Sequence, residues 1–348
     1  MIKILHSADW HLGAPMAQQA DLRQALQAIP EKIANLCKQE NCDLMLLSGD
    51  IFDGNCGAAT VQAVRNALES VAVPVYISPG NHDFVSLDSP WLQDSWPENV
   101  HIFTHPAIES VDVPGLDCCV YGAGYISMDC PGLLADFTPT HTEKYSVGIL
   151  HGDPTQISSP NCPITAEQVA ASGFDYLALG HIHKGGSFTA GNTLCAWSGC
   201  PMGRGYDETG EKGVLIVTVD ETVSTRFVPL DTPRFYDLEV DAQTSLDQIL
   251  PPVGNDNHYR ITFIGSSEPL DLGAIAAQYS RFPNLVLRDK TTPPVDLWGS
   301  ADDDTLEGKY FKLLQDKLET ADPETKKRIL IAAEISRKLL DGQEVVLP

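Results

Sequence analysis

Aspartate, asparagine and histidine side chains recur in this sequence directly after short apolar runs. Their order is Asp-x-His, Gly-Asp-x-x-Asp, Gly-Asn-His-Asp, a single His and Gly-His-x-His. Imidazole, carboxylate and amide donors together suit Mn²⁺, Fe²⁺ or Zn²⁺, whereas Mg²⁺ and Ca²⁺ prefer oxygen alone. Because these residues exceed what one ion needs, we expect two divalent ions that share a carboxylate. The candidate ligands are Asp9, His11, Asp50, Asn81, His151, His181 and His183.

The apolar runs that precede these residues are expected to be β-strands. The run before Asp50 is bounded by polar residues and by Gly49, which is typical of a buried strand followed by a tight turn. In open α/β sheets ligands bind beyond the carboxyl ends of the strands, so we expect all the candidates at one rim. The runs are Ile2–Leu5, Cys42–Leu47, Pro74–Ile77, Tyr145–Leu150 and Tyr176–Leu179.

The order of these motifs resembles that of the calcineurin-like metallophosphoesterases, and the resemblance implies roles for single residues. The first metal ion would be held by Asp9, His11, Asp50 and His183. The second would be held by Asp50, which is shared, Asn81, His151 and His181. His82 resembles the family's catalytic histidine, which is not a ligand, and Asp83 is expected to orient it by a hydrogen bond. The implied chemistry is phosphodiester hydrolysis with manganese favoured and iron or zinc as alternatives.

The stretch Trp197–Glu208, followed by Glu211-Lys212-Gly213, narrows the resemblance to SbcD-like DNA-repair exonucleases, especially their YhaO-like branch. On composition alone this stretch would be a flexible glycine loop. Arg204 within it is expected to clamp a phosphate through two hydrogen bonds. Lys184 is a second candidate for phosphate contact, with a solvated loop as the alternative. Asp53 stands where eukaryotic and archaeal relatives have histidine, so the role of that histidine cannot be transferred.

The order of segments predicts an α/β protein. Helices are expected at Asp21–Gln39, where Pro30 kinks or splits the helix, and at Ala58–Val71. Helices that alternate with strands in this way favour a parallel sheet. Short alternating segments between Val100 and Val228 suggest a second, mixed sheet packed on the first. They are Val100–Phe103, Ile108–Val113, Cys118–Tyr121 and Val214–Val219. The result would be a four-layer α/β/β/α sandwich, which is also what the resemblance implies.

Three domains are expected. Residues 1–231 would form the metallophosphoesterase domain, and Thr232-Pro233 would begin the next. Residues 232–292 are expected to form a small α+β unit that matches the cap domain of SbcD-like proteins, with a rigid accessory domain as the alternative. Residues 293–348 contain a linker and a C-terminal helical pair.

The helical pair is defined by its caps. Asp304 and Glu307 form a capping-box pattern for the first helix, and Asp322-Pro323 begins a second that ends near Gly342. The resemblance implies that the pair docks on the coiled-coil base of an SbcC-like ATPase. A pair that folds back on its own core is the alternative.

Composition limits the possible functions. The 348 residues carry a formal charge of −24, which argues against tight DNA binding by this chain alone, because nucleic-acid binders usually present basic surfaces. A hydrophobic content of 43% is typical of a globular protein, and no apolar run approaches the roughly 20 residues that a membrane helix needs. We expect no signal peptide, and nine cysteines without Cys-x-x-Cys pairs indicate reduced thiols in the cytoplasm.

Three functions therefore compete. The first is a metal-dependent DNA exonuclease or endonuclease that works with an SbcC-like ATPase in repair. The second is a phosphatase or phosphodiesterase for small molecules or cyclic nucleotides, which the negative charge slightly favours. The third is a scaffold whose helical tail organises the ATPase. A homodimer is implied by the resemblance, but no apolar stripe in the sequence supports it independently.

Overall fold

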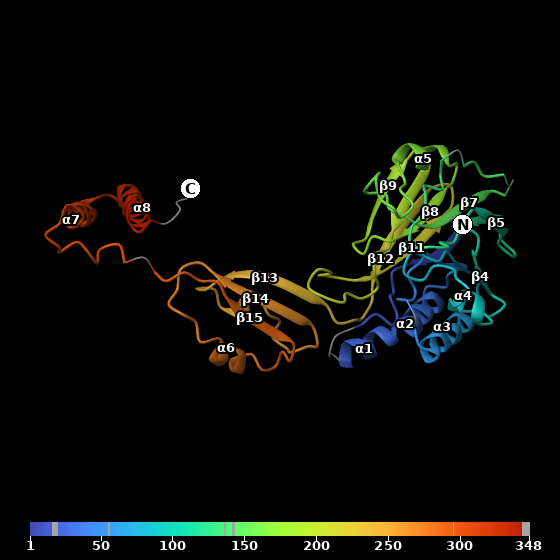
Figure 1. Ribbon diagram of the computed structural model, residues 1–348, viewed down its shortest axis with the longest axis horizontal. Helices are drawn as coiled ribbons and strands as arrows, with labels where there is room; N and C mark the ends of the chain where they lie inside the picture. The colour runs from blue at the N-terminus through green and yellow to red at the C-terminus, as the bar shows by residue number, and fades with distance from the viewer. Residues whose placement is uncertain (16–19, 55, 136, 141–142, 295, 343–348) are drawn as a thin grey trace. The chain divides into compact units, whose positions relative to one another are not determined.

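The computed structural model describes the chain except residues 16–19, 55, 136, 141–142, 295 and 343–348. Two six-stranded sheets form the centre of the N-terminal part of the chain (Figure 1). The first sheet contains β1 (Ile2–Ser7), β2 (Leu44–Leu47), β3 (Val75–Ile77), β4 (Val100–Ile102), β11 (Gly213–Val219) and β12 (Val223–Pro229). The second contains β5 (Glu109–Asp112), β6 (Cys118–Gly122), β7 (Tyr145–His151), β8 (Tyr176–Gly180), β9 (Gly186–Ala190) and β10 (Thr193–Trp197).

The first sheet has the order β12-β11-β1-β2-β3-β4, in which β1 to β4 are parallel. The second has the order β5-β6-β7-β8-β10-β9, in which β6, β7, β8 and β10 are parallel. The expectation that Val100–Phe103 and Val214–Val219 belong to the second sheet was wrong. Strand β4 extends the first sheet beside β3, and β11 returns to pair antiparallel with β1.

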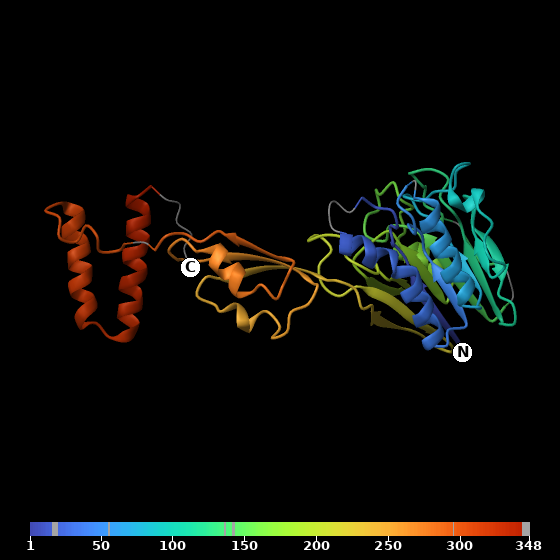
Figure 2. The same ribbon diagram turned by 90° about the horizontal axis from the view of Figure 1, so that it is seen from below.

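Helices cover the outer face of the first sheet. They are α1 (Ala20–Gln27), α2 (Ile29–Gln39), α3 (Ala58–Ser70) and the short α4 (Pro90–Gln93). In Figure 2 these blue and cyan helices lie in front of the sheets. Pro30 splits the expected first helix, because it stands in the first turn of α2, where its missing N–H group costs no hydrogen bond. The outer face of the second sheet is covered by α5 (Ala166–Ala171) and irregular segments, so the four-layer α/β/β/α prediction is confirmed.

Apolar side chains of both sheets fill the space between them, and one buried polar group links the sheets close to their carboxyl ends. Nδ1 of His6 on β1 lies 2.7 Å from the hydroxyl oxygen of Tyr176 on β8. Nε2 of the same ring lies 3.1 Å from the carbonyl oxygen of Leu179 and 3.0 Å from Oγ of Ser48. Because a buried ring with both nitrogens bonded fixes the distance between its neighbours, His6 sets the spacing of the sheets below the predicted rim.

The chain divides into two compact units. The first contains Met1–Asp237 with residues 255–260 and 282–284, and the second contains the remainder. A three-stranded sheet, β13-β14-β15, follows the two larger sheets in the sequence. Its elements are β13 (Phe235–Asp241), a 3₁₀ turn at Leu246–Gln248, β14 (His258–Ile264), α6 (Leu272–Gln278) and β15 (Leu285–Asp289). This is the expected small α+β unit, and the predicted domain limits stay a prediction.

The helical pair consists of α7 (Leu306–Thr320) and α8 (Pro323–Leu340). The capping box of Asp304 and Glu307 was wrong by one residue, because Thr305 is the N-cap and its hydroxyl accepts from the N–H of Gly308. The Asp322-Pro323 start was confirmed. Phe311 is fully buried between the helices. None of the described helices combines the length and apolarity that a membrane crossing requires.

Acid should weaken the fold through His6. Burial lowers the pKa of His6 to about 3, although the Leu179 carbonyl opposes this shift. Since the folded pKa lies below the ordinary value of 6.5, the stabilisation is complete above pH 6.5 and is lost as the pH falls toward 3. We expect a loss of roughly 3 kcal/mol in the free energy of unfolding between pH 7 and pH 4, measured by urea denaturation.

Two variants isolate this contribution. His6→Asn removes the titrating ring and should flatten the pH dependence by the same amount, whereas His105→Asn changes an exposed ring and should leave the dependence unchanged. A His6→Asn protein with the wild-type dependence on pH would contradict the assignment.

Candidate metal centre

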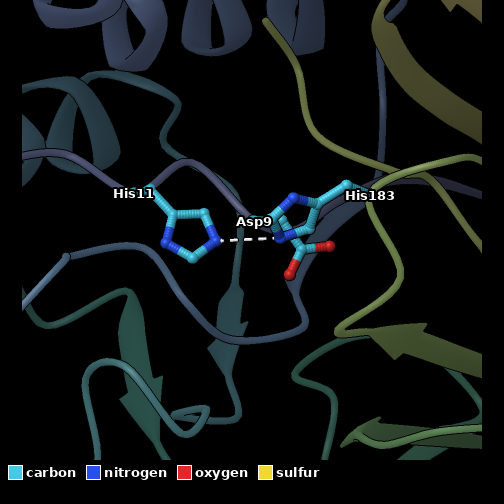
Figure 3. A group of neighbouring side chains, drawn as sticks. All are labelled: Asp9, His11 and His183. Carbon is cyan, nitrogen blue, oxygen red and sulfur yellow. Dashed lines mark hydrogen bonds between the residues drawn. The ribbon is translucent and has the colours of Figure 1, made fainter. Parts of the chain in front are cut away.

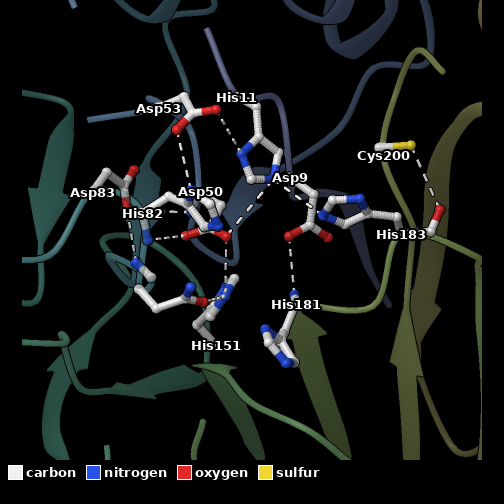
Figure 4. Close-up of polar contacts among 12 residues, drawn as sticks. Asp9, His11, Asp50, Asp53, His82, Asp83, His151, His181, His183 and Cys200 are labelled. Atoms are coloured by element: carbon white, nitrogen blue, oxygen red, sulfur yellow. Dashed lines mark hydrogen bonds and ion pairs between the residues drawn. The ribbon is translucent and has the colours of Figure 1, made fainter. Parts of the chain in front are cut away.

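The seven predicted ligands lie together where the carboxyl ends of five strands meet. Figure 4 labels six of them, and the seventh, Asn81, lies 3.0 Å from Nε2 of His151 through its amide oxygen. Loops after β1, β2 and β3 carry four of them, and β7 and the loop after β8 carry the three histidines from the second sheet. Those that follow the first sheet are Asp9, His11, Asp50 and Asn81, and those from the second are His151, His181 and His183. The rim is therefore built by both sheets, and neither sheet alone could supply it.

Several of these side chains are held by backbone in an unfavourable conformation. Among the described residues, seven that are not glycine have a left-handed φ, and four of these belong to the rim: Asp9 (56°), His11 (48°), Asp50 (52°) and His181 (88°). Such conformations cost about 1–3 kcal/mol each and persist when the surrounding structure enforces them. Their concentration here indicates that the loops are shaped for function.

Two glycines allow the loops to approach one another. Gly49 has a φ of 86°, and a Cβ atom there would lie 2.5 Å from Nδ1 of His151. A Cβ atom on Gly80 would overlap a carboxylate oxygen of Asp50. Any side chain at either position would push apart the candidate ligands from different strands.

The first group of acceptors contains Asp9, His11 and His183, which Figure 3 shows facing one another. Nε2 of His11 lies 3.1 Å from Nε2 of His183. Glu208 lies 2.6 Å from Nδ1 of His183, and because a carboxylate only accepts, this nitrogen carries the proton. Nε2 of His183 is then the ring nitrogen that can bind a metal ion. Oδ2 of Asp9 is buried and has no hydrogen-bond partner, so a cation suits the space between these atoms.

The second group of acceptors surrounds His151. Nδ1 of His151 donates to the carbonyl oxygen of Ser48 at 2.8 Å, so Nε2 is the nitrogen that faces the rim. This nitrogen lies 3.0 Å from the amide oxygen of Asn81 and 3.4 Å from Oδ2 of Asp50. The His181 ring is nearby, with its centre 5.3 Å from that of His151. Either a proton or a metal ion must therefore lie among these acceptors.

Asp50 stands between the two groups. Its Oδ1 accepts from the N–H of His82 at 2.8 Å, which fixes the carboxylate. Its Oδ2 lies 3.4 Å from Nε2 of His151 and 3.7 Å from Nε2 of His11. One carboxylate oxygen thus faces both sets of acceptors, as a shared ligand must.

Burial shifts the pKa values of the candidate ligands. Asp9, His11, Asp50 and His151 are each 1% exposed. Burial raises the pKa of Asp9 to about 6 and lowers the pKa of His11 to about 3. Burial opposes charge on His151 too, but Asp50 outweighs it and raises the pKa of His151 to about 9. The site therefore favours positive charge among its carboxylates, and its mixed donors fit two divalent ions.

His82 is oriented by a different carboxylate from the one predicted. Nδ1 of His82 lies 3.1 Å from Oδ1 of Asp53, and the His82 side chain is 42% exposed. Asp83 is buried and instead accepts from the backbone N–H groups of Gly80 at 2.7 Å and Ile51 at 2.8 Å. Burial raises the pKa of Asp83 to about 7. The expected orienting role of Asp83 was wrong, because its oxygens hold the two loops together.

The two predicted phosphate contacts also differ in their surroundings. Lys184 is exposed and lies at a pocket of about 690 Å³, which Lys212 and Trp197 also line. The guanidinium group of Arg204 is partly occupied, because its Nη2 donates to Glu208 at 2.9 Å. Its Nη1 lies 3.9 Å from Oδ2 of Asp53, the residue that also contacts His82. Arg204 can therefore offer a phosphate one nitrogen, and the expected two-fold clamp does not fit.

Two residues that the rim uses leave only weak signals in the sequence. Asp53 follows Asp50 at the spacing of the second motif, but which histidine it would meet depends on the fold. Glu208 follows Arg204 by four residues and contacts His183 from a loop that is far away in the sequence. Neither partner can be derived from local pattern.

Replacement of the shared carboxylate should empty the centre. Asp50→Asn removes the negative charge that both acceptor groups face, so we expect loss of at least one metal ion per chain and a fall in phosphodiester hydrolysis of at least about 100-fold. Metal content after dialysis is measured by elemental analysis. The exposed Asp88→Asn is the matched control and should retain wild-type content. A full metal complement in Asp50→Asn would exclude a shared ligand at this position.

Comparisons with known proteins agree with this geometry. The model of the calcineurin-like phosphoesterase family matches residues 2–185. The chain is 30% identical over 236 residues to the uncharacterized metallophosphoesterase YhaO of Bacillus subtilis, a match that covers 63% of this chain and 57% of YhaO. It is 25% identical over 262 residues to the SbcD component of the nuclease SbcCD from the same organism, covering 62% of this chain and 66% of that relative. Each match thus spans less than two thirds of the relative.

Among solved structures, a dimetal phosphatase from Danio rerio is similar with a TM-score of 0.45 and 13% identity, over 65% of this chain and 98% of that one. The family model, in contrast, matches more than half of the sequence and includes every candidate ligand. The chain therefore belongs to the calcineurin-like phosphoesterase family, whose members hydrolyse phosphoester bonds with a dinuclear metal centre.

Proposed function

We propose that this protein is a two-metal phosphodiesterase that cleaves DNA together with an SbcC-like coiled-coil ATPase. The observation that carries the proposal is the pair of acceptor groups on either side of Asp50, with His82 beside them. The similarity to the SbcD component of the nuclease SbcCD supports DNA as the substrate and an ATPase as the partner. The YhaO similarity agrees with the same branch.

The metal ligands in this proposal are divided between two positions. Asp9, His11, Asp50 and His183 would hold one ion. Asp50, Asn81, His151 and His181 would hold the other. We favour Mn²⁺, with Fe²⁺ or Zn²⁺ as alternatives, because imidazole and carboxylate donors are mixed. When bound, the two ions supply Lewis-acid activation and neutralise charge on the phosphoryl oxygens.

His82 acts on the leaving oxygen in this proposal. Asp53 accepts from Nδ1 of His82 and so leaves Nε2 as the free nitrogen of an exposed ring. When Nε2 is also protonated, a ring held in this way can give that proton to the departing sugar oxygen and return to the neutral form. Lys184 would contact a neighbouring phosphate of the substrate, and Nη1 of Arg204 would reach one from the other side of Asp53.

The helical pair is the proposed docking element for the ATPase. Leu313, Leu330 and Leu339 are exposed apolar side chains on α7 and α8. Exposed apolar groups on a small helical unit are typical of protein interaction surfaces. The small sheet of β13 to β15 would be the cap domain that restricts DNA entry. Homodimer formation belongs to the same proposal and is supported by the resemblance alone.

The cysteines agree with a cytoplasmic site of action. All nine lie in the described part of the chain, and all are free thiols. Disulfides are rare in the reducing cytoplasm, so thiols that stay unpaired suit that compartment.

A second candidate function is hydrolysis of small phosphoesters or cyclic nucleotides. The net charge of −24 favours it, because long polyanions are repelled by an acidic protein. Under the first proposal, the ATPase would supply the basic surface that this chain lacks.

Removal of the proposed proton donor should leave metal binding intact and slow phosphodiester cleavage. His82→Ala is expected to retain both metal ions, since His82 faces Asp53 and is not among the proposed ligands, yet to lose about 100- to 10,000-fold in cleavage rate. Elemental analysis and a phosphodiester assay are run on the same samples. The exposed His105→Ala should behave as wild type. Full cleavage by His82→Ala would exclude the proposed role.

Digestion of labelled DNA distinguishes the two functions. With Mn²⁺ present, single- and double-stranded DNA are incubated with the chain alone and with an SbcC-like ATPase and ATP. We expect slow cleavage by the chain alone and a clear acceleration by the partner. The second function would be favoured if cyclic nucleotides were hydrolysed rapidly and DNA were not cleaved, either by the chain alone or with the ATPase.

A further inference from the structure

The loop that follows β10 is wrapped around one residue of the metal centre, His183. The backbone N–H of Cys200 donates to the carbonyl oxygen of His183 at 3.2 Å, and Nζ of Lys212 donates to the same oxygen at 3.3 Å. A Cβ atom on Gly199 would lie 2.7 Å from this oxygen, so a glycine is needed for the approach. The backbone of His183 is thus fixed by one loop.

The same loop also holds the His183 ring. Oε1 of Glu208 lies 2.6 Å from Nδ1 of His183, and Glu208 is only 8% exposed. Because the carboxylate accepts the proton of Nδ1, the neutral ring has its lone pair on Nε2. That nitrogen lies 3.1 Å from Nε2 of His11 at the first metal position (Figure 3). Without Glu208, the ring would be free to rotate and to exchange tautomers.

Glu208 is itself held by Arg204. Nη2 of Arg204 donates to Oε1 of Glu208 at 2.9 Å, and the backbone N–H of Arg204 donates to Oε2 at 2.7 Å. A buried carboxylate that lacked such partners would be costly, so the arginine makes the position of Glu208 stable. The four-residue spacing lets one short turn supply both groups.

A third metal ion between these residues would be the alternative interpretation. His183, Cys200 and Glu208 offer ligand atoms within 4.8 Å of one another. Nη2 of Arg204, however, lies 2.9 Å from Glu208 and 3.2 Å from Nδ1 of His183. A guanidinium already supplies positive charge there, and a metal ion would have to displace it.

We propose that Glu208, held by Arg204, is a positioning residue that fixes the tautomer of His183 and thereby raises the metal affinity of the first position and not of the second. The inference rests on the proposed function through the assignment of His183 as a ligand. Residues outside the ligand set that orient a ligating histidine typically contribute about 10- to 100-fold in metal affinity.

Mn²⁺ titration of the full chain, with free Mn²⁺ followed by electron paramagnetic resonance, tests the proposal. In Glu208→Ala we expect one dissociation constant to rise about 10- to 100-fold while the other changes less than about threefold. Glu208→Gln keeps an oxygen that can accept from Nδ1 and should lose less. Asp207→Asn, an exposed neighbour, is the matched control and should match wild type. Two unchanged constants in Glu208→Ala would overturn the proposal, as would a third site that only this variant loses.

The histidine tautomer gives a readout that needs no metal. Nitrogen-15 chemical shifts of the His183 ring in the metal-free chain should report a protonated Nδ1 in wild type and Asp207→Asn, and a mixture of tautomers in Glu208→Ala. If Glu208→Ala does not fold, as judged by circular dichroism, the comparison is made with Glu208→Gln, which should show a partial shift. A neutral His183 ring with its proton on Nε2 and none on Nδ1 in wild type would overturn the proposal. Absence of any Mn²⁺ binding by wild type would instead reject the proposed function and leave the tautomer test valid.

Discussion

The structure depends on one constraint: buried nitrogen and oxygen acceptors converge at the rim, so a proton or a metal ion must lie between them. Nε2 of His11 faces Nε2 of His183, and Nε2 of His151 faces oxygens of Asn81 and Asp50. Facing lone pairs repel, and burial removes the water that would otherwise satisfy them. A cation reverses the sign of each interaction. The residues with left-handed backbone conformations and the crowded acceptors therefore cost folding free energy, and bound metal offsets this cost.

Sequence pattern found most of this centre because its signals are local. Each candidate ligand follows an apolar run within a few residues, and a glycine marks the turn after β2. Strand pairing is not local, so β4 and β11 were expected in the wrong sheet. The capping error at Thr305 has a different origin, since Asp304 and Thr305 are both good cap residues and only backbone geometry selects between them.

Assignments of contacts between side chains were the least predictable. Asp83 is the direct neighbour of His82 in the sequence, and that proximity suggested a hydrogen bond between the two. Successive side chains of a loop often point in different directions, and here Asp83 turns inward to the N–H groups of Gly80 and Ile51. Asp53, which is 29 residues before His82, reaches the ring instead. Such pairings are set by how loops pack, and one sequence does not contain that information.

Two pairs of a histidine and a carboxylate at this rim have the same chemistry but different proposed roles. Asp53 accepts from His82, and Glu208 accepts from His183, so both rings have Nε2 as their free nitrogen. What that nitrogen faces decides its use. The His82 side chain is 42% exposed, so it is open to a substrate, whereas Nε2 of His183 faces His11 and suits a metal ion. Arg204 lies between the two carboxylates, 2.9 Å from Glu208 and 3.9 Å from Asp53. A single guanidinium therefore couples the charge at the proposed proton donor, His82, to the charge at the proposed ligand, His183. A change in either carboxylate should alter the electrostatic environment of both rings.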